Sequence, residues 1–85
     1  MKSQLKTEIE MFVIGRVRTM RDEAKLSQSE LAFKLGVSNG FIGQVESSNS
    51  PTKYNLNHLD KLAAIFKCSP KDFMPEKPIN ETRLD

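Results

Sequence analysis

The sequence predicts an all-α domain built from five helices. Apolar residues recur at three- and four-residue spacing along most of the chain, which is the period of an amphipathic helix. Helix start signals precede these segments, and no segment shows the alternating apolar and polar pattern of a half-buried strand. The 85 residues, 38% of them hydrophobic, suffice for one small core.

The first helix is expected over about residues 8–24. Thr7 is followed three residues later by Glu10, which is the spacing of a capping box at a helix start. One face of this helix then carries the apolar residues Ile9, Phe12, Val13, Val17 and Met20. Such a stripe is typical of a helix packed on a core.

The second helix is expected over residues 28–35. Ser27 and Glu30 form another capping-box pattern. The apolar residues on one face of this helix are Leu31, Ala32 and Leu35. Gly36 stands where the chain must leave the helix, because glycine adopts a left-handed backbone without a steric penalty from Cβ.

A third helix, over about residues 39–47, follows this glycine closely. Ser38 is placed to cap it, and Ile42 and Val45 recur at core spacing. Two helices joined by a turn of three to four residues form the arrangement that presents its second helix to the major groove of DNA. The segment 27–46 therefore predicts a sequence-specific DNA-binding protein.

A polar loop containing Pro51 separates this pair from a fourth helix. The fourth helix is expected to start near Leu56, under a cap from Asn55 or Asn57. Its apolar face is formed by Leu59, Leu62, Ala63 and Phe66.

A fifth helix is signalled by Ser69 as a cap and Pro70 at the first helical position. It should be short, because Pro75 and Pro78 follow. Residues 75–85 are polar and interrupted by these prolines, so we expect a mobile tail there.

Across the second and third predicted helices, several residues hold a fixed spacing: Gln28, Leu31, Ala32, Gly36, Val37, Ser38, Ile42, Val45 and Glu46. This pattern resembles the helix-turn-helix of phage repressors and Cro, the xenobiotic-response-element family, over roughly residues 13–74. The resemblance implies a lambda-repressor-like domain of five helices, with the helix-turn-helix at helices 2 and 3. Residues 1–74 would form this domain, with an N-terminal helix extension before the matching part, and 75–85 the tail.

The resemblance also implies a dimer on an operator with two half-sites about one helical turn apart. Leu5, Ile9 and Phe12 precede the part that matches the family. They are candidates for the dimer interface, and the alternative is that they close the bottom of the core.

The outer face of the third helix carries the residues expected to contact DNA bases: Asn39, Gly40, Phe41 and Gln44. Asn and Gln can each bind adenine through N6 and N7, although both could also be ordinary surface amides. The ring of Phe41 could touch a thymine methyl or fold back over the loop. The residues expected to contact the DNA backbone are Gln28, Ser38, Ser47, Asn49, Thr52, Lys53 and Tyr54, of which the loop residues could equally form a plain polar loop.

Two features of the third helix depart from the family pattern. Gly40 and Gly43 each cost ~1 kcal/mol of helix propensity relative to Ala, but small residues permit close approach to DNA. The helix also lacks Arg and Lys, so the bidentate guanine contact is missing and A·T readout is favoured.

Arg21 and Glu46 are expected to form a buried ion pair between the first and third helices. Arg21 continues the row of Ile14 and Val17 at helical spacing, and Glu46 falls on the core side of its helix. An unpaired carboxylate there would be costly. The family that the chain resembles carries a paired Arg and Glu at these two places.

Composition and motifs argue against an enzyme. His58 has no second ligand at metal spacing and no nucleophile beside it, so we expect a surface residue and no metal site. Cys68, the single cysteine, is expected to be a small core residue. No cofactor motif, membrane span or signal peptide is present, and we expect a cytoplasmic protein.

The net charge of +2 predicts only modest non-specific affinity for DNA. The leading interpretation is a transcriptional repressor that binds double-stranded DNA as a homodimer on a palindromic operator. One alternative is the antitoxin of a toxin–antitoxin pair, with the tail as a segment that orders on a protein partner. Another is a protein-interaction module without DNA binding.

Overall fold

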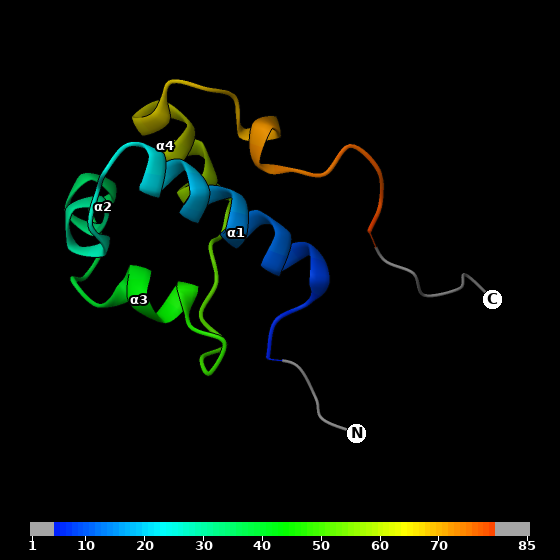
Figure 1. Cartoon of the computed structure of the whole chain (residues 1–85), viewed down its shortest axis with the longest axis horizontal. Coiled ribbons are helices and arrows are strands. Elements are labelled where there is room, and N and C mark those ends of the chain that lie inside the picture. Colours follow the sequence, from blue (N-terminus) through cyan, green and yellow to red (C-terminus); the bar gives the residue numbers. More distant parts are fainter. Residues whose placement is uncertain (1–4, 80–85) are drawn as a thin grey trace.

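The computed structural model describes residues 5–79, which form four α-helices and a 3₁₀ turn and contain no strand. The elements are α1 (Glu8–Glu23), α2 (Gln28–Leu35), α3 (Phe41–Glu46), α4 (Leu56–Phe66) and η1 (Pro70–Phe73). In Figure 1, α1 crosses the middle of the molecule, with α4 above it and α3 below. The prediction of an all-α domain is confirmed for the described residues, but the fifth helix is not an α-helix.

The brevity of η1 follows from the proline that comes soon after it, Pro75. Ser69 accepts a hydrogen bond from the backbone N–H of Lys71, and Pro70 occupies the first position, as expected for a helix start. Met74 already has an extended backbone, which is the conformation favoured before a proline such as Pro75. Four residues are too few for an α-helical ladder, so the segment closes as a 3₁₀ turn. The expected tail continues to residue 85, and residues 80–85 lie outside the described part.

The capping boxes determine where α1 and α2 begin. The backbone N–H of Glu10 donates to Thr7 Oγ1 at 3.3 Å, and that of Glu30 donates to Ser27 Oγ at 2.9 Å. Each glutamate carboxylate in turn accepts a hydrogen bond from the backbone N–H of its capping residue, Thr7 or Ser27. Gly36 ends α2 with φ +79°, in the left-handed region that the sequence required.

The core lies between the four helices and η1. Its buried residues are Val13, Val17, Leu31, Ala32, Leu35, Ile42, Leu59, Leu62, Ala63 and Phe73. Cys68 packs against this cluster while half-buried, as do Met20 and Phe66.

The apolar stripe expected on α1 is only partly correct. Ile9 and Phe12 remain 45% and 41% exposed, so they do not close the core. Ile14 and Arg21 take inner positions instead. In Figure 1 the N-terminal end of α1 extends past α2, α3 and α4, which leaves its first turns without a helix to cover them.

Candidate nucleic-acid interface

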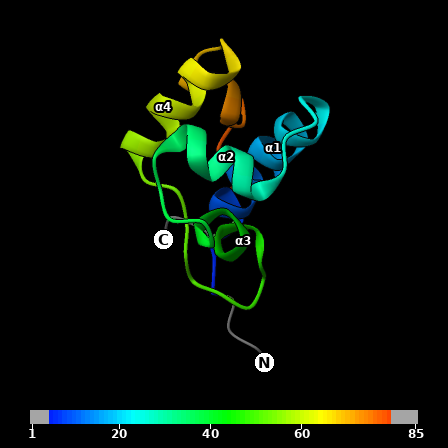
Figure 2. The same cartoon turned by 90° about the vertical axis from the view of Figure 1, so that its left-hand side faces the viewer.

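Helix α3 forms one end of the molecule and lies low in both views (Figures 1 and 2). Ile42 and Val45 are fully buried, so they fix which face of the helix turns inward. Asn39 and Gln44, the expected base-contacting residues, are both exposed. The side chain of Gln44 therefore lies on the outer face of the helix, and Asn39 lies in the turn before it.

The start of α3 differs from the prediction by two residues. The helix begins at Phe41, its N-cap is Gly40, and no side chain caps it. Ser38 therefore does not cap the helix as expected. Its carbonyl instead accepts a hydrogen bond from the backbone N–H of Phe41 at 3.0 Å. Residues 38–41 therefore form a turn, and the helix begins only at its last residue.

The loop after α3 is bound to the outer face of the helix through Gln44. Thr52 donates from Oγ1 to Gln44 Oε1 at 3.3 Å, and Ser50 Oγ donates to Thr52 Oγ1 at 3.0 Å. The backbone N–H of Asn49 donates to Ser47 Oγ at 3.1 Å. A residue expected to contact bases and residues expected to contact phosphates thus lie next to one another.

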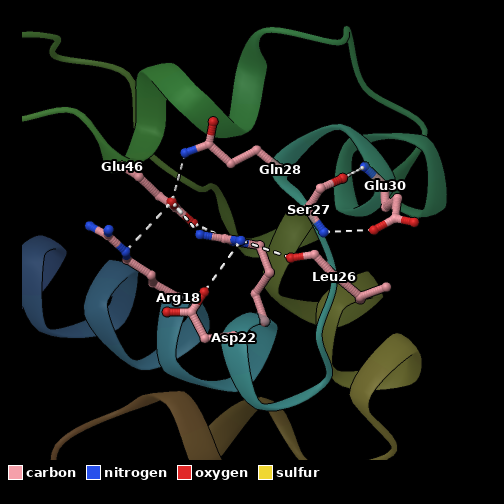
Figure 3. Close-up of polar contacts among 8 residues, drawn as sticks. Arg18, Asp22, Leu26, Ser27, Gln28, Glu30 and Glu46 are labelled. Atoms are coloured by element: carbon pink, nitrogen blue, oxygen red, sulfur yellow. Dashed lines mark hydrogen bonds and ion pairs between the residues drawn. The ribbon is translucent and has the colours of Figure 1, made fainter.

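Gln28 contacts α3 as well as beginning α2. Its Nε2 donates to Glu46 Oε1 at 3.0 Å (Figure 3). A Cβ added to Gly43 would come within 3.1 Å of Gln28 Oε1. The glycine inside α3 therefore has a role that the sequence did not reveal, because it leaves room for the Gln28 side chain.

Arg21 and Glu46 lie in contact with bidentate geometry, and both side chains are less than 10% exposed. Arg21 donates from Nε to Glu46 Oε2 and from Nη2 to Oε1, both at 2.9 Å. Its Nη1 donates to the carbonyl of Leu26 at 2.8 Å, and Arg18 Nε lies 3.9 Å from Glu46 Oε1. Hydrogen bonding to Glu46 raises the pKa of Arg21 and outweighs the opposing effect of burial. The last turn of α3 is thereby joined to α1 (Figure 3).

The first residue of α3 belongs to a cluster of three rings. The centroid of the Phe41 ring lies 4.9 Å from that of His58 and 6.1 Å from that of Tyr54. Of the two interpretations of Phe41, the structure shows the ring packed back on the loop and on α4. Contact with a thymine methyl stays a prediction.

The other two members of the cluster differ from what the sequence suggested. His58 is half-buried rather than a plain surface residue, and its Nδ1 accepts the backbone N–H of Asn55 at 3.1 Å. Burial, with a smaller effect of Lys61, lowers the pKa of His58. The Tyr54 hydroxyl is buried without a hydrogen-bond partner among the described residues, and burial raises its pKa. The expected phosphate contact of Tyr54 cannot be made through this hydroxyl.

Lys53 is already paired within the molecule. Its Nζ lies 2.8 Å from Glu10 Oε2 on α1. This hydrogen bond is the main cause that lowers the pKa of Glu10. A phosphate contact from Lys53 would require the pair to open or to share the ammonium.

Lys6 is the residue that the sequence analysis missed. Only 6% of it is exposed, and its Nζ donates to the carbonyl oxygens of Val45 at 2.7 Å, Gln44 at 3.3 Å and Ser47. Burial lowers its pKa, while Glu10 opposes that shift. The contact spans about 40 residues of sequence, so no local pattern could have signalled it.

Residues 5–79 contain no group of three His, Cys, Asp or Glu side chains able to hold a metal ion. Within the same part of the chain, every helix is too short or too polar to cross a membrane.

Comparison with known proteins identifies a helix-turn-helix domain and a related transcriptional regulator. The model of the family described as "Helix-turn-helix" matches residues 17–73. The HTH-type transcriptional regulator SinR of Bacillus subtilis is 33% identical over 70 residues, which cover 82% of this chain and 60% of SinR. The chain thus spans about three fifths of the length of that relative.

Solved structures agree with this assignment. The restriction-modification controller protein C.AhdI of Aeromonas hydrophila has a TM-score of 0.65 and 28% identity over 75% of this chain and 94% of that one. The P22 c2 repressor in complex with a synthetic operator has a TM-score of 0.62 and 30% identity, covering 84% and 100%. SinR in its complex with SinI has a TM-score of 0.63 and 30% identity, covering 75% and 61%.

The matched residues include all of α2, α3 and α4, whose arrangement presents the polar face of α3 outward. The chain therefore belongs to the helix-turn-helix family of the xenobiotic-response-element type, a family of DNA-binding transcriptional regulators that includes phage repressors.

Proposed function

We propose that this chain is a transcriptional repressor that binds a palindromic operator as a homodimer, with α3 of each copy in the major groove. The observation that carries the proposal is the exposure of two amide side chains, Gln44 on α3 and Asn39 in the turn before it. The opposite face of α3 is fully buried, and the Arg21–Glu46 pair holds the helix to α1. The complex of the P22 c2 repressor, a 30% identical relative, with a synthetic operator supports operator binding here.

Base recognition is assigned to Asn39 and Gln44, with Gly40 and Phe41 beside them. The amide side chains of Asn and Gln match the donor and acceptor that adenine presents in the major groove. Nothing lies within 4 Å of a Cβ added to Gly40, so this surface is open to a close approach. Residues 38–47 contain no Arg or Lys, which favours an A·T-rich operator.

Phosphate contacts are assigned to both sides of this face. Gln28 lies at the N-terminus of α2, where unpaired backbone N–H groups and the helix dipole favour an anion. Ser38 lies in the turn before α3 and is exposed. The loop after α3 supplies Ser47, Asn49 and Thr52.

The dimer is assigned to the first turns of α1. Leu5, Ile9 and Phe12 are between 41% and 48% exposed, and Ile9 lines an apolar hollow of about 380 Å³ beside Met74. A small domain with apolar side chains left at one end gains stability when a second copy covers them.

Selection of bound sequences from a random pool of double-stranded DNA tests the proposal. The expected result is one A·T-rich palindrome with half-sites about one helical turn apart. A pool that returns no preferred sequence would overturn base recognition, and a single unrepeated half-site would overturn the palindrome.

Substitution then tests the residues assigned to base contacts. Asn39→Ala or Gln44→Ala should lower affinity for the selected operator by about 1–3 kcal/mol and leave binding to random DNA nearly unchanged. Asn57→Ala is the matched control, because Asn57 is an exposed amide on α4. Equal losses on operator and random DNA would contradict base readout.

A second candidate is a regulator that also binds a partner protein, as the antitoxin of a toxin–antitoxin pair does. The complex of SinR with SinI shows that a relative of this chain binds a partner protein, and this supports the candidate. We assign residues 1–74 to the DNA-binding domain and residues 75–85 to a tail that could contact such a partner. A neighbouring toxin reading frame, and a stable complex with its product, would favour this candidate.

A further inference from the structure

We propose that the segment preceding α1 completes the recognition helix, because Lys6 acts as the C-cap of α3. In this proposal Lys6 is a positioning residue for DNA binding, and it belongs to a part of the chain that precedes the family match at residues 17–73. Its role in DNA binding rests on the proposed function, whereas its effect on α3 does not.

Helix α3 has few means of its own to stay folded. It has six residues, no side-chain cap at its N-terminus and no basic residue in its last turn. Helices of this length are unstable alone, and the last carbonyl groups of any helix lack partners within it. The ends of α3 therefore depend on groups from elsewhere in the molecule.

Lys6 supplies what the C-terminal end of α3 lacks. Its ammonium has three N–H donors, and it lies within hydrogen-bonding distance of three carbonyl oxygens, those of Gln44, Val45 and Ser47. A positive charge at this end also opposes the negative end of the helix dipole. In Figure 1 the blue segment before α1 runs down on the side of the loop that follows α3, which agrees with these contacts.

Two of these three carbonyl groups belong to residues whose side chains are assigned to DNA. Gln44 is a proposed base contact and Ser47 a proposed phosphate contact, so Lys6 fixes the backbone from which both side chains project. Lys6 as a whole is 6% exposed, and its ammonium is already bound to three carbonyl oxygens, so it has little capacity left for a phosphate. Its effect on DNA binding is therefore indirect.

The Arg21–Glu46 pair holds the same end of α3 by a different route. Arg21 binds the side chain of Glu46, whereas Lys6 binds only backbone oxygens. Arg21 holds the last turn of α3 against α1, and Lys6 holds the peptide groups of that turn in helical geometry. Loss of Lys6 should therefore fray α3 while the rest of the domain stays folded.

The experiment uses the full chain with Lys6→Met, which removes the ammonium and keeps an unbranched apolar stem. Lys71→Met is the matched control, because it removes the same charge from an exposed lysine in η1, on the opposite side of the molecule from α3 (Figure 1). Amide hydrogen exchange without DNA is the first measurement. Amides of α3 should exchange about tenfold faster in Lys6→Met, while amides of α4 keep their rates, because hydrogen bonds from a buried charged group are lost only at α3.

Unchanged exchange in α3 would overturn the proposal, and so would equal acceleration in α3 and α4, which would indicate a general loss of stability. If Lys6→Met does not fold, Lys6→Gln decides, since its amide lacks the charge, offers two donors in place of three and ends one atom short of the lysine nitrogen, so it cannot replace the three bonds of the ammonium. For Lys6→Gln, accelerated exchange confined to α3 supports the cap, and unchanged rates overturn it.

Binding to the selected operator is the second measurement. Lys6→Met should weaken specific binding about tenfold and leave the slope of log affinity against log salt unchanged, because no phosphate contact is lost. A slope smaller by about one would instead identify Lys6 as a phosphate contact and overturn the positioning role. If the wild-type chain selects no operator, the proposed function fails, and hydrogen exchange alone decides whether Lys6 caps α3.

Discussion

The carboxylate of Glu46 shows how a single buried charge can be stabilised by several neighbours. Its side chain is 3% exposed, and it accepts hydrogen bonds from Arg21 and Gln28 with Arg18 close by. A carboxylate buried without these donors would lose its hydration, and no hydrogen bond or ion pair would compensate for that loss. Three elements therefore meet at one residue of the recognition helix.

We predict that Arg21→Met lowers the free energy of unfolding by about 3–5 kcal/mol, because the buried Glu46 charge loses its partner. Urea denaturation measures the loss. In a double-mutant cycle with Glu46→Leu, the double variant should be less destabilised than the sum of the two single variants. Additive losses would show that the two side chains are energetically independent.

The glutamates in the capping boxes of α1 and α2, Glu10 and Glu30, should make stability depend on pH. The pKa of Glu10 is lowered chiefly by its hydrogen bond to Lys53, and that of Glu30 by the backbone N–H of Ser27. Both start from an ordinary value of 4.5. A carboxyl with a lowered pKa in the folded state binds fewer protons there than in the unfolded state, so its contribution is full above about pH 5 and is lost as the pH falls.

We therefore predict that the double variant Glu10→Gln, Glu30→Gln flattens the fall in unfolding free energy between about pH 5 and pH 3. Glutamine can keep the capping hydrogen bonds, so this variant should still fold. Glu23→Gln, which removes a charge from the last turn of α1, serves as the control. A pH profile that matches the wild type would contradict the linkage.

Among the elements, those with local end signals were predictable and α3 was not. The starts of α1, α2 and α4 follow from side chains within three residues, with Asn55 as the cap of α4. Sequence could not place the start of α3, because Ser38 has the cap chemistry but its turn brings Gly40 to the cap position instead. At the other end of α3, Lys6 binds backbone oxygens from a distant part of the chain, and no local rule can predict such a contact.

One helix end is held in a strained backbone. Lys67, the C-cap of α4, has φ +58°, in the left-handed region that L residues avoid. We predict that Lys67→Gly raises the free energy of unfolding by about 0.5–1 kcal/mol, the relief of strain exceeding the added entropy of the unfolded chain. Lys61→Gly, inside the same helix, should lower it by about 1 kcal/mol. Thermal unfolding of both variants gives the comparison, and destabilisation by both would contradict the cap geometry.

For the whole molecule, the sequence predicted the core better than the surface. The spacing of Leu31, Leu35, Ile42 and Val45 was enough to identify the buried faces of α2 and α3, because burial repeats with the helical period. Contacts between distant segments carry no such period. The packing of Phe41 on His58, and the space that Gly43 leaves for Gln28, depend on how the elements are assembled.

The exposed end of α1 gives a prediction about assembly. Ile9→Ser and Phe12→Ser should each weaken the proposed dimer about tenfold or more, since each removes an apolar side chain from the interface. Phe33→Ser is the matched control, because Phe33 is 87% exposed on α2, away from this end of the molecule. Sedimentation equilibrium measures the dissociation constants. If only Phe33→Ser raised the dissociation constant of the dimer, the interface would lie on α2 and not at the start of α1.

The hydrogen bond from Thr52 to Gln44 has a consequence for how selective the recognition helix is. An amide side chain can usually rotate by half a turn, which exchanges its acceptor and its donor and lets it match more than one pattern of base edges. The Thr52 hydroxyl accepts a hydrogen bond from Ser50 and donates one to the oxygen of Gln44, and this direction of the two bonds favours one of the two amide orientations before DNA binds. That oxygen has a second lone pair, so it can bind a base without releasing Thr52. The loop thus fixes which way the donor and the acceptor of the Gln44 amide point. The rotational entropy of this amide is therefore lost during folding rather than on binding to the operator.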